Sequence, residues 1–313
     1  MLNRAVVFSL TSSEKVTDEV CEKLKIEKGI SEVKHFADGE IMARSVNTVR
    51  GKDCYIIQST CNPVTERLME LLVFIDSLKR ASAREITAII PYFGYARQDR
   101  KSKSREPITA RLVADLLKTS GVDRVVTFDL HAAQIQGFFS CPVDNLSFVN
   151  KLGSYFSNLC KNEDICVVSP DHGGVVRARN LAQQLNASIA IFDKRRPRPN
   201  VAEMCDIIGE VKNKTCILID DIVDTGGTIC AASSELVKRG AKKVYVGLTH
   251  PVFSNGAIER LKASPIDGIV CSNTIELAQT DPKITVISIG DMIAKAVECI
   301  ENGESIAPLY DEK

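Results

Sequence analysis

The chain has 313 residues, 44% of them hydrophobic, and its 40 Lys and Arg residues balance 40 Asp and Glu residues. This length predicts two domains with complete cores, and the balanced charge excludes a general basic surface for nucleic acid or a membrane. The 11 Cys residues include no Cys-x-x-Cys pair, which argues against a disulfide framework or a structural zinc site and favours a reducing cytoplasm. We expect neither a secretory signal nor a membrane-spanning helix.

The first 91 residues alternate short apolar runs with helical patterns. We expect strands at residues 5–8, 32–36, 41–45, 53–58 and 86–91, with helices at 12–24 and 63–78. Phe36-Ala37-Asp38-Gly39-Glu40 lies between two of these strands. Since Asp-Gly is a common turn pair, a hairpin turn is the simplest interpretation. The alternative is a nucleotide site, in which a purine ring stacks on Phe36 and the two carboxylates accept its hydrogen bonds.

A basic segment follows the strand at 86–91. It has five positive charges between Arg97 and Arg105, and aromatic residues precede it. A solvated loop is the simplest interpretation, and a nucleic-acid patch has little support in a neutral chain. The segment lies at the carboxyl end of a strand, where α/β sheets bind their ligands, and Arg side chains suit polyphosphate oxygens. We therefore predict a polyphosphate-binding loop.

A helix from about Pro107 to Lys118 and a strand at 124–128 lead to His131, a candidate metal ligand or phosphate donor, although a lone His is usually structural. Residues 120–131 resemble residues 239–250: both follow a helix that ends at Gly, form a strand and stop at His, 119 residues apart. Few residues are identical. The pattern nevertheless predicts two similar α/β domains, at 1–147 and 148–313.

In the second half we expect a helix from about 148, strands at 165–169, 188–192, 205–211, 215–219, 269–271 and 285–289, and a helix at 291–301. Asp171 follows the first of these strands and precedes two Gly residues. Its carboxylate could hold Mg²⁺ through water, or simply cap a helix. The segment 193–200 carries four cations and two Pro residues, so we expect an exposed, mobile loop rather than a helix or buried strand. Such a loop could close over a phosphoryl group during its transfer, or be a solvated linker.

The most informative stretch is 216–228, where a buried strand runs into Asp220 and Asp221 and then into Asp224-Thr225-Gly226-Gly227-Thr228. The glycines and the start of the next helix predict a ring of amide donors for a phosphate. Three carboxylates would repel that anion unless they bind something else. Either vicinal sugar hydroxyls or a divalent metal would satisfy them. The combination favours a sugar phosphate over a solvated acidic turn.

This stretch resembles the phosphoribosyl-diphosphate (PRPP) binding motif of the type I phosphoribosyltransferase fold. Nearly the whole chain is similar to class I ribose-phosphate pyrophosphokinases (PRPP synthetases) of the bacterial type. Six stretches carry this resemblance, at 36–40, 95–99, 129–132, 169–174, 194–200 and 220–228. The resemblance implies an α/β fold of two phosphoribosyltransferase-like domains, each a mostly parallel sheet flanked by helices, the first on the ATP side and the second binding ribose 5-phosphate.

The resemblance also implies the reaction, in which the diphosphoryl group of ATP passes to the C1 hydroxyl of ribose 5-phosphate and AMP is released. It implies roles for four groups of residues: Phe36, Asp38, Gly39, Glu40, Arg97, Gln98, Asp99 and His131 bind ATP; His131 and Asp171 attend Mg²⁺; Lys194 and Arg196 stabilise the transition state; and Arg196, Asp220, Asp221, Asp224, Thr225, Gly226, Gly227 and Thr228 hold ribose 5-phosphate.

By the same resemblance we expect a homohexamer in which the 36–40 loop reaches the nucleotide of a neighbouring subunit, with phosphate as an activating effector and ADP as an inhibiting one. The composition leads us to expect a cytoplasmic protein with no nucleic-acid or membrane partner. Thr48 stands near Arg50 where many family members carry Ser, so the residues of an effector site are not assigned. Two alternatives stay open. A PRPP-consuming phosphoribosyltransferase would share the 220–228 motif but would not need the 97–105 loop. A non-catalytic regulatory relative should have lost the loop cations, whereas Lys194 and Arg196 are present.

Overall fold

The computed structural model describes residues 2, 4–195, 204–279 and 281–310. It contains two compact units. Unit 1 consists of Met1–Ser147, Thr274–Glu276 and Ser288–Lys313, and unit 2 of Phe148–Asn273 and Leu277–Ile287. The division after Ser147 falls where the sequence placed its domain boundary. Within the described ranges, no helix combines the length and apolar character needed to cross a membrane.

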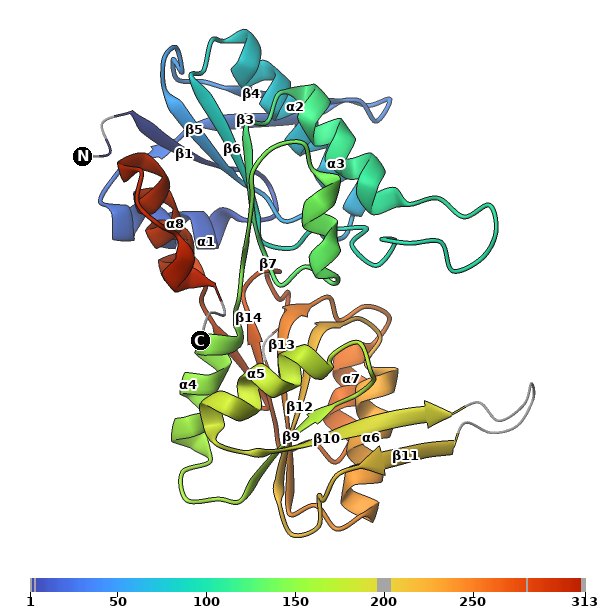
Figure 1. The fold of residues 1–313 in the computed structure, drawn as a ribbon. Helices are drawn as coiled ribbons and strands as arrows, with labels where there is room; N and C mark the ends of the chain where they lie inside the picture. Colours follow the sequence, from blue (N-terminus) through green and yellow to red (C-terminus); the bar gives the residue numbers. More distant parts are fainter. Residues whose placement is uncertain (1, 3, 196–203, 280, 311–313) are drawn as a thin grey trace. The chain divides into compact units, whose positions relative to one another are not determined.

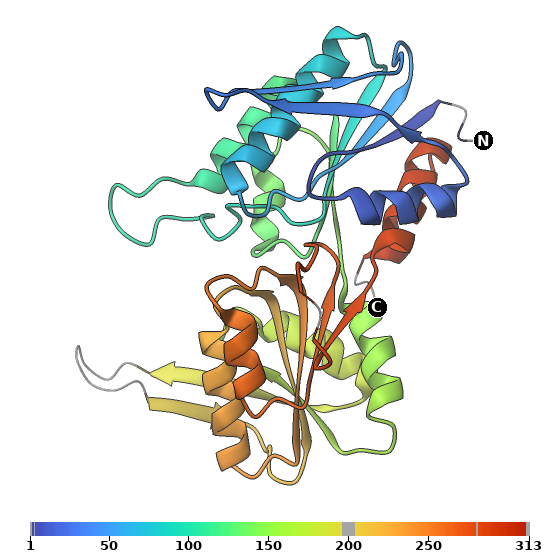
Figure 2. The same ribbon diagram turned by 180° about the vertical axis from the view of Figure 1, so that it is seen from behind.

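Unit 1 is built on a parallel sheet of six strands in the order β2-β1-β5-β6-β7-β8. Helices α1 and α8 cover one face, and α2 and α3 cover the other (Figures 1 and 2). Because both faces are covered, its central strands are continuous apolar runs. The elements are β1 Ala5–Ser9, α1 Glu14–Leu24, β2 Lys28–Gly29, β5 Asp53–Ile57, α2 Val64–Arg80, β6 Glu85–Ile90, α3 Thr109–Ser120, β7 Arg124–Phe128, η1 Ala133–Phe138, β8 Val143–Leu146, α8 Gly290–Asn302 and η2 Ala307–Leu309.

A separate antiparallel hairpin, β3 (Ser31–His35) and β4 (Ile41–Ser45), packs against α2 in unit 1. Alternate residues of β3 face the body of the unit. Ser31 donates its hydroxyl to the Ser9 carbonyl at 2.6 Å, and Val33 packs on the hydrophobic core. The hairpin is therefore fixed along one face while its turn projects from the sheet.

Helix α8 belongs to unit 1, although the predicted second domain extended to residue 313. Its buried face contains Ile293, Ala296 and Val297, and it packs on α1. The hydroxyl of Tyr55, in the central strand β5, donates to Glu301 at 2.8 Å. An amphipathic pattern shows that a helix must cover a sheet, but it does not show which of two similar sheets.

Unit 2 is built on a seven-stranded sheet in the order β11-β10-β9-β12-β13-β14-β15, in which only the β10–β11 pair is antiparallel. Helices α4 and α5 cover one face, and α6 and α7 the other (Figures 1 and 2). The elements are α4 Val149–Leu159, β9 Ile165–Ser169, α5 Val175–Leu185, β10 Ser188–Arg195, β11 Met204–Ile208, β12 Thr215–Val223, α6 Gly227–Lys238, β13 Lys243–Pro251, α7 Ala257–Ala263, β14 Gly268–Ser272 and β15 Ile284–Ile287.

The two units share one chain path, which confirms the prediction of two similar α/β domains. In each unit the first strand leads through a helix to a strand on one side. The chain then crosses to the other side and continues outward, as β5-α2-β6-α3-β7-β8 in unit 1 and β12-α6-β13-α7-β14-β15 in unit 2. The strand order therefore reverses between β1 and β5 and between β9 and β12. Such reversal points are where open α/β sheets bind ligands.

The predicted sequence repeat matched the two halves of the chain with a shift of one strand–helix unit relative to the structure. It matched β7 with β13, whereas the shared path matches β7 with β14 and β13 with β6. A helix that ends at Gly and leads into a buried strand recurs along α/β chains, so the pattern cannot identify which unit is meant. The two histidines also differ, because His131 is exposed beyond the end of β7 and His250 is buried within β13.

Candidate functional site

The turn between β12 and α6 contains the predicted phosphate loop. Gly226 precedes the helix with φ 77°, a left-handed conformation that favours glycine, and α6 begins at Gly227. Thr225, Gly227 and Thr228 are exposed. Gly226, the N-cap residue, has no side chain to cap this helix. The first amide groups of α6 are therefore presented outward, an arrangement that binds anions.

The segment between β13 and α7 supports this turn. The Ser254 hydroxyl donates to the Asp224 carboxylate, and the Ser254 amide donates to the Asp224 carbonyl at 3.0 Å. The guanidinium of Arg260 donates to the carbonyl oxygen of Thr225. These contacts fix the loop from its outer side, so the amide groups on its other side need little rearrangement to bind a ligand.

Asp220 and Asp221 form an acidic pair at the end of β12. Asp221 is buried and Asp220 is half-buried. Nη1 of Arg177, on α5, lies 3.2 Å from Oδ1 of Asp221 and 3.8 Å from Oδ1 of Asp220. Burial raises the pKa of Asp220 well above its ordinary value, and the neighbouring charge of Asp221 raises it further, against the opposing effect of Arg177. A ligand that donates hydrogen bonds here would relieve the repulsion.

Sequence reasoning missed Arg177. The signal was an arginine in the first turn of the helix that follows the Asp171 turn, a position near the carboxyl ends of the strands. Because the predicted cations all lay in loops rich in positive charge, an Arg in an amphipathic helix was indistinguishable from a surface residue. Its two carboxylate contacts show that it partly neutralises the acidic pair.

Asp171 follows β9, on the other side of the same reversal point. Its Oδ1 accepts the Gly174 amide at 3.1 Å, which stabilises the turn before α5, and the side chain is exposed. Because β9 and β12 are adjacent parallel strands, Asp171 and Asp220 lie at the same edge of the sheet, and the charge of Asp171 adds to the raised pKa of Asp220. Carboxylate oxygens suit Mg²⁺, which commonly keeps waters and substrate phosphates as its other ligands. The described residues contain no group of three or more His, Cys, Asp or Glu side chains placed to hold a metal alone.

The basic segment 193–200 begins within strand β10, which corrects the prediction that it forms a loop throughout. β10 continues through Lys194 to Arg195, and Asp193, Lys194 and Arg195 pair with Asp206, Cys205 and Met204 of β11. This part of β10 extends beyond β9, which pairs with β10 only as far as Ile191. His172 Nε2 also lies 3.1 Å from Oδ1 of Asp193. Arg196 and the rest of the segment to residue 203 lie outside the described residues.

The predicted nucleotide turn Phe36–Glu40 is the tip of the β3–β4 hairpin, so the hairpin interpretation is correct for its structure. Phe36 donates its amide to the Glu40 carbonyl at 2.9 Å, and Glu40 donates its amide to Oδ1 of Asp38 at 3.1 Å. Gly39 has φ 91°, which suits glycine. Phe36 is 49% exposed, so its ring is available for stacking. A hairpin turn and a nucleotide contact are therefore compatible.

The other predicted ATP-side residues follow β6 and β7 in unit 1. Arg97, Gln98 and His131 are exposed, whereas Asp99 is buried and accepts a hydrogen bond from Gln134 Nε2 at 3.1 Å. The side-chain oxygen of Gln98 accepts a hydrogen bond from Thr109 at the start of α3. Asp99 therefore holds the basic loop to η1. The predicted ATP-side residues all lie in unit 1, whereas Asp171, Lys194 and the 220–228 stretch lie in unit 2.

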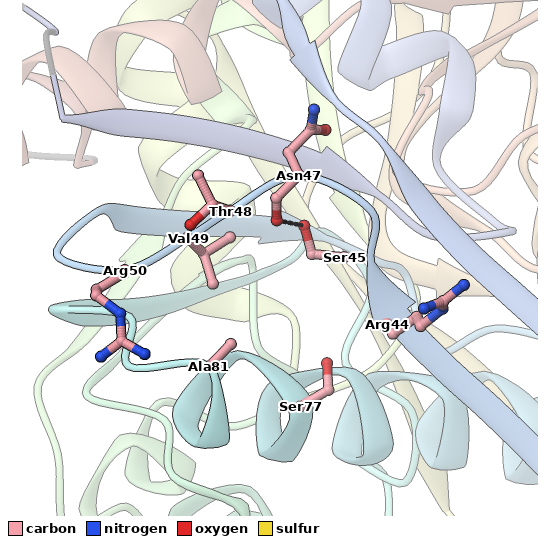
Figure 3. A pocket seen from close by; sticks show the side chains of 8 residues that line it. All are labelled: Arg44, Ser45, Asn47, Thr48, Val49, Arg50, Ser77 and Ala81. Carbon is pink, nitrogen blue, oxygen red and sulfur yellow. Dashed lines mark hydrogen bonds between the residues drawn. The ribbon is translucent and has the colours of Figure 1, made fainter.

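Unit 1 also has a polar hollow of about 320 Å³ between the segment that follows β4 and the C-terminal part of α2 (Figure 3). Its lining side chains are Arg44, Ser45, Asn47, Thr48, Val49, Arg50, Ser77 and Ala81. Arg50 donates to the Ser82 hydroxyl at 3.0 Å. Arg44 donates its Nε to the Glu32 carboxylate at 2.8 Å, so the Arg50 guanidinium is the group that, with nearby hydroxyl and amide groups, best suits a small anion.

Comparison with known proteins identifies the family. Residues 5–121 match the N-terminal domain of ribose phosphate pyrophosphokinase, and residues 181–311 match the phosphoribosyl synthetase-associated domain. The chain is 53% identical to ribose-phosphate pyrophosphokinase of Bacillus caldolyticus, covering 97% of each chain, and 51% identical to that of Bacillus subtilis, covering 97% of this chain and 96% of the relative. The crystal structure of phosphoribosylpyrophosphate synthetase from Mycobacterium smegmatis superposes with a TM-score of 0.92 at 40% identity, covering 96% of this chain and 100% of that chain. The chain belongs to the ribose-phosphate pyrophosphokinase family.

Proposed function

We propose that this protein is a ribose-phosphate pyrophosphokinase that transfers the diphosphoryl group of ATP to the C1 hydroxyl of ribose 5-phosphate, giving PRPP and AMP. The observation that carries the proposal is identity of about half over 97% of the chain to relatives of that name. The open turn at Gly226 and Gly227 supports it, because the product and one substrate are both sugar phosphates.

Unit 2 is the ribose 5-phosphate side in this proposal. The 5-phosphate binds at the amide groups of Thr225, Gly226, Gly227 and Thr228, where the dipole of α6 favours an anion. The ribose hydroxyls donate to Asp220 and Asp221, and Asp224 completes the turn. Such hydrogen bonds stabilise the charged form of Asp220, which burial disfavours in the free protein.

Unit 1 is the ATP side. Phe36 offers an exposed ring for the adenine, and Asp38 and Glu40 add acceptors for its amino group. Arg97 and Gln98 bind the polyphosphate from the loop that Asp99 holds in place. His131 lies exposed beyond β7, where it can donate to a phosphate oxygen.

Phosphoryl transfer requires positioning and charge stabilisation more than covalent help from the protein. The resemblance assigns His131 of unit 1 and Asp171 of unit 2 to Mg²⁺, which would neutralise charge on the triphosphate. Lys194 supplies a cation from β10, and Arg196 is assigned the same role by resemblance. We expect Lys194→Ala to lower turnover by orders of magnitude with little change in ATP affinity. A variant as fast as the parent would remove Lys194 from the mechanism.

The expected regulation, assembly and location complete the proposal. Phosphate and ADP act as effectors, and the hollow beside Arg44 and Arg50 is our candidate for a phosphate group (Figure 3). If phosphate acts there, Arg50→Ala should abolish the response of turnover to inorganic phosphate while basal activity persists. A retained response would place the effector elsewhere.

We also propose a cytoplasmic homohexamer, which light scattering of the purified protein can test.

The deciding experiment supplies ATP, ribose 5-phosphate and Mg²⁺ and measures AMP and PRPP. We expect both products in equal amounts, and only when the sugar phosphate is present. Absence of AMP, or AMP release without ribose 5-phosphate, would contradict the proposal. The comparisons do not favour the two alternatives, a PRPP-consuming phosphoribosyltransferase and a non-catalytic regulatory subunit, and the same assay distinguishes both from a synthetase.

A further inference from the structure

The strand-reversal point of unit 1 is filled by protein side chains. Glu70, on α2, is fully buried there. Its Oε2 accepts hydrogen bonds from the Thr11 hydroxyl and, at 2.8 Å, from Gln58 Nε2. Its Oε1 lies 3.2 Å from Arg67 Nη1 and 3.3 Å from His35 Nε2. We call Glu70 and these four partners the Glu70 cluster.

The Glu70 cluster joins separate parts of unit 1. Thr11 follows β1, Gln58 follows β5, Arg67 lies on α2 and His35 ends β3. Thr11 and Gln58 fix one carboxylate oxygen from the sheet side, and Arg67 balances the charge. A buried carboxylate with this many donors has a defined orientation, because any rotation leaves a donor unsatisfied. Its other oxygen is therefore a fixed acceptor for His35.

His35 is the last residue of β3 and is covalently joined to Phe36, the first residue of the candidate nucleotide turn. It pairs with Ile41, the first residue of β4, so it stands at the base of that turn. Like Ser31 and Val33, it faces the body of the unit. Among the ion pairs and side-chain hydrogen bonds of the described residues, the His35–Glu70 contact is the one nearest the turn that reaches outside the hairpin.

We propose that Glu70 is a positioning residue for the ATP side, acting through His35 to hold the Phe36–Glu40 turn in its nucleotide-binding place. The inference rests on the proposed function, since it takes the turn to contact ATP. The turn itself is closed by short-range hydrogen bonds, which set its shape. The cluster sets its location relative to the sheet and holds its base, so a turn released from the cluster also breaks its Phe36–Glu40 hydrogen bond more often. A displaced turn should weaken the binding of ATP and leave the binding of ribose 5-phosphate unchanged.

The test uses His35 variants, because removing Glu70 itself would leave Arg67 unpaired and endanger folding. His35→Ala deletes the contact at a side chain that is 44% exposed. His35→Gln keeps an N–H donor of similar reach. Lys34→Ala is the matched control, since it is the adjacent residue of β3, faces the opposite side and is exposed. Two quantities are measured on each full-length protein: the KM values for ATP and ribose 5-phosphate, and amide hydrogen exchange at Phe36.

We expect His35→Ala to raise the KM for ATP about tenfold, to leave the KM for ribose 5-phosphate within twofold, and to accelerate exchange at Phe36. His35→Gln should restore both quantities, and Lys34→Ala should match the parent. Unchanged exchange in His35→Ala would overturn the inference, as would faster exchange with an unchanged KM for ATP. A parent that makes no AMP would instead overturn the proposed function, and the exchange measurement would still decide whether the cluster holds the turn.

Discussion

The turns β12–α6 and β5–α2 occupy equivalent places in the two units, yet their chemistry is opposite. In unit 2, the helix begins with the exposed residues Gly227 and Thr228, and its first amide groups point outward. In unit 1, Gln58, Ser59 and Thr60 are buried, and their polar side-chain atoms form hydrogen bonds with nearby residues of the same unit. Thr60, for example, donates its hydroxyl to the Tyr92 carbonyl and accepts the Gly94 amide at 2.6 Å.

The difference shows that the shared chain path provides a place for a ligand but does not make a site. A site at this place needs a backbone that a phosphate can approach, which two glycines supply in unit 2. Unit 1 begins the matching helix after Pro63, which has no amide proton, and fills the space with the Glu70 cluster. One reversal point presents open backbone amide groups, and the other is filled by a structural centre.

The largest effect should come from removing the structural centre. We expect Glu70→Ala to lower the free energy of unfolding by about 3 kcal/mol, because it leaves Arg67 and three donors without their shared acceptor. Urea denaturation measures this loss. Glu66→Ala, at an exposed position one turn earlier on α2, should change stability by less than about 0.5 kcal/mol. Equal effects in the two variants would show that the cluster is not a structural centre.

The next effect concerns the acidic pair of unit 2. We expect Asp220→Asn to lower kcat/KM for ribose 5-phosphate about 100-fold, or about 2.7 kcal/mol, because the neutral amide is a weaker acceptor for the sugar hydroxyls. Steady-state kinetics measures the change. Asp164→Asn, at an exposed carboxylate of the same unit, should leave the rate unchanged. An active Asp220→Asn variant would argue that the pair does not contact the sugar.

A smaller effect should follow from crowding the open turn. A Cβ at Gly227 would meet only Thr225 Oγ1, at 3.9 Å, so Gly227→Ala should fold normally. The added methyl group would intrude on a phosphate at the start of α6. We expect the KM for ribose 5-phosphate to rise about 30-fold, about 2 kcal/mol. Gly137→Ala in unit 1, where a Cβ meets nothing within 4 Å, is the control. An unchanged KM would show that the phosphate does not bind at this turn.

The smallest effect is on stability against pH. Because the pKa of Asp220 is raised on folding, the folded protein keeps a proton that the unfolded chain releases. The stabilisation from this proton is present below the ordinary aspartate pKa and is lost as pH rises through the raised value. We therefore expect Asp220→Asn to raise Tm by about 2 °C at neutral pH and to lose this advantage in acid. A lower Tm at neutral pH would show that Arg177 outweighs the burial of Asp220.

Much of the architecture could be predicted, because buried parallel strands are continuous apolar runs and their polar ends mark the sites. The turn at Gly226 and the hairpin at Gly39 follow from local backbone chemistry in the same way. Arg177 could not be found, because its role depends on which strand α5 packs beside. Glu70 was hidden for a similar reason: a carboxylate on a helix is usually exposed, and only the contacts from Thr11, Gln58 and His35 explain its burial.

The placement of α8 has a consequence for the newly made polypeptide. Unit 1 takes its last layer from residues that are translated after all of unit 2, so the first 147 residues leave the ribosome without the helix that covers α1 and bonds to Tyr55. During synthesis, unit 2 can close while unit 1 still exposes an apolar face. The part of unit 1 that is synthesised first can therefore complete its fold only after α8 has been made.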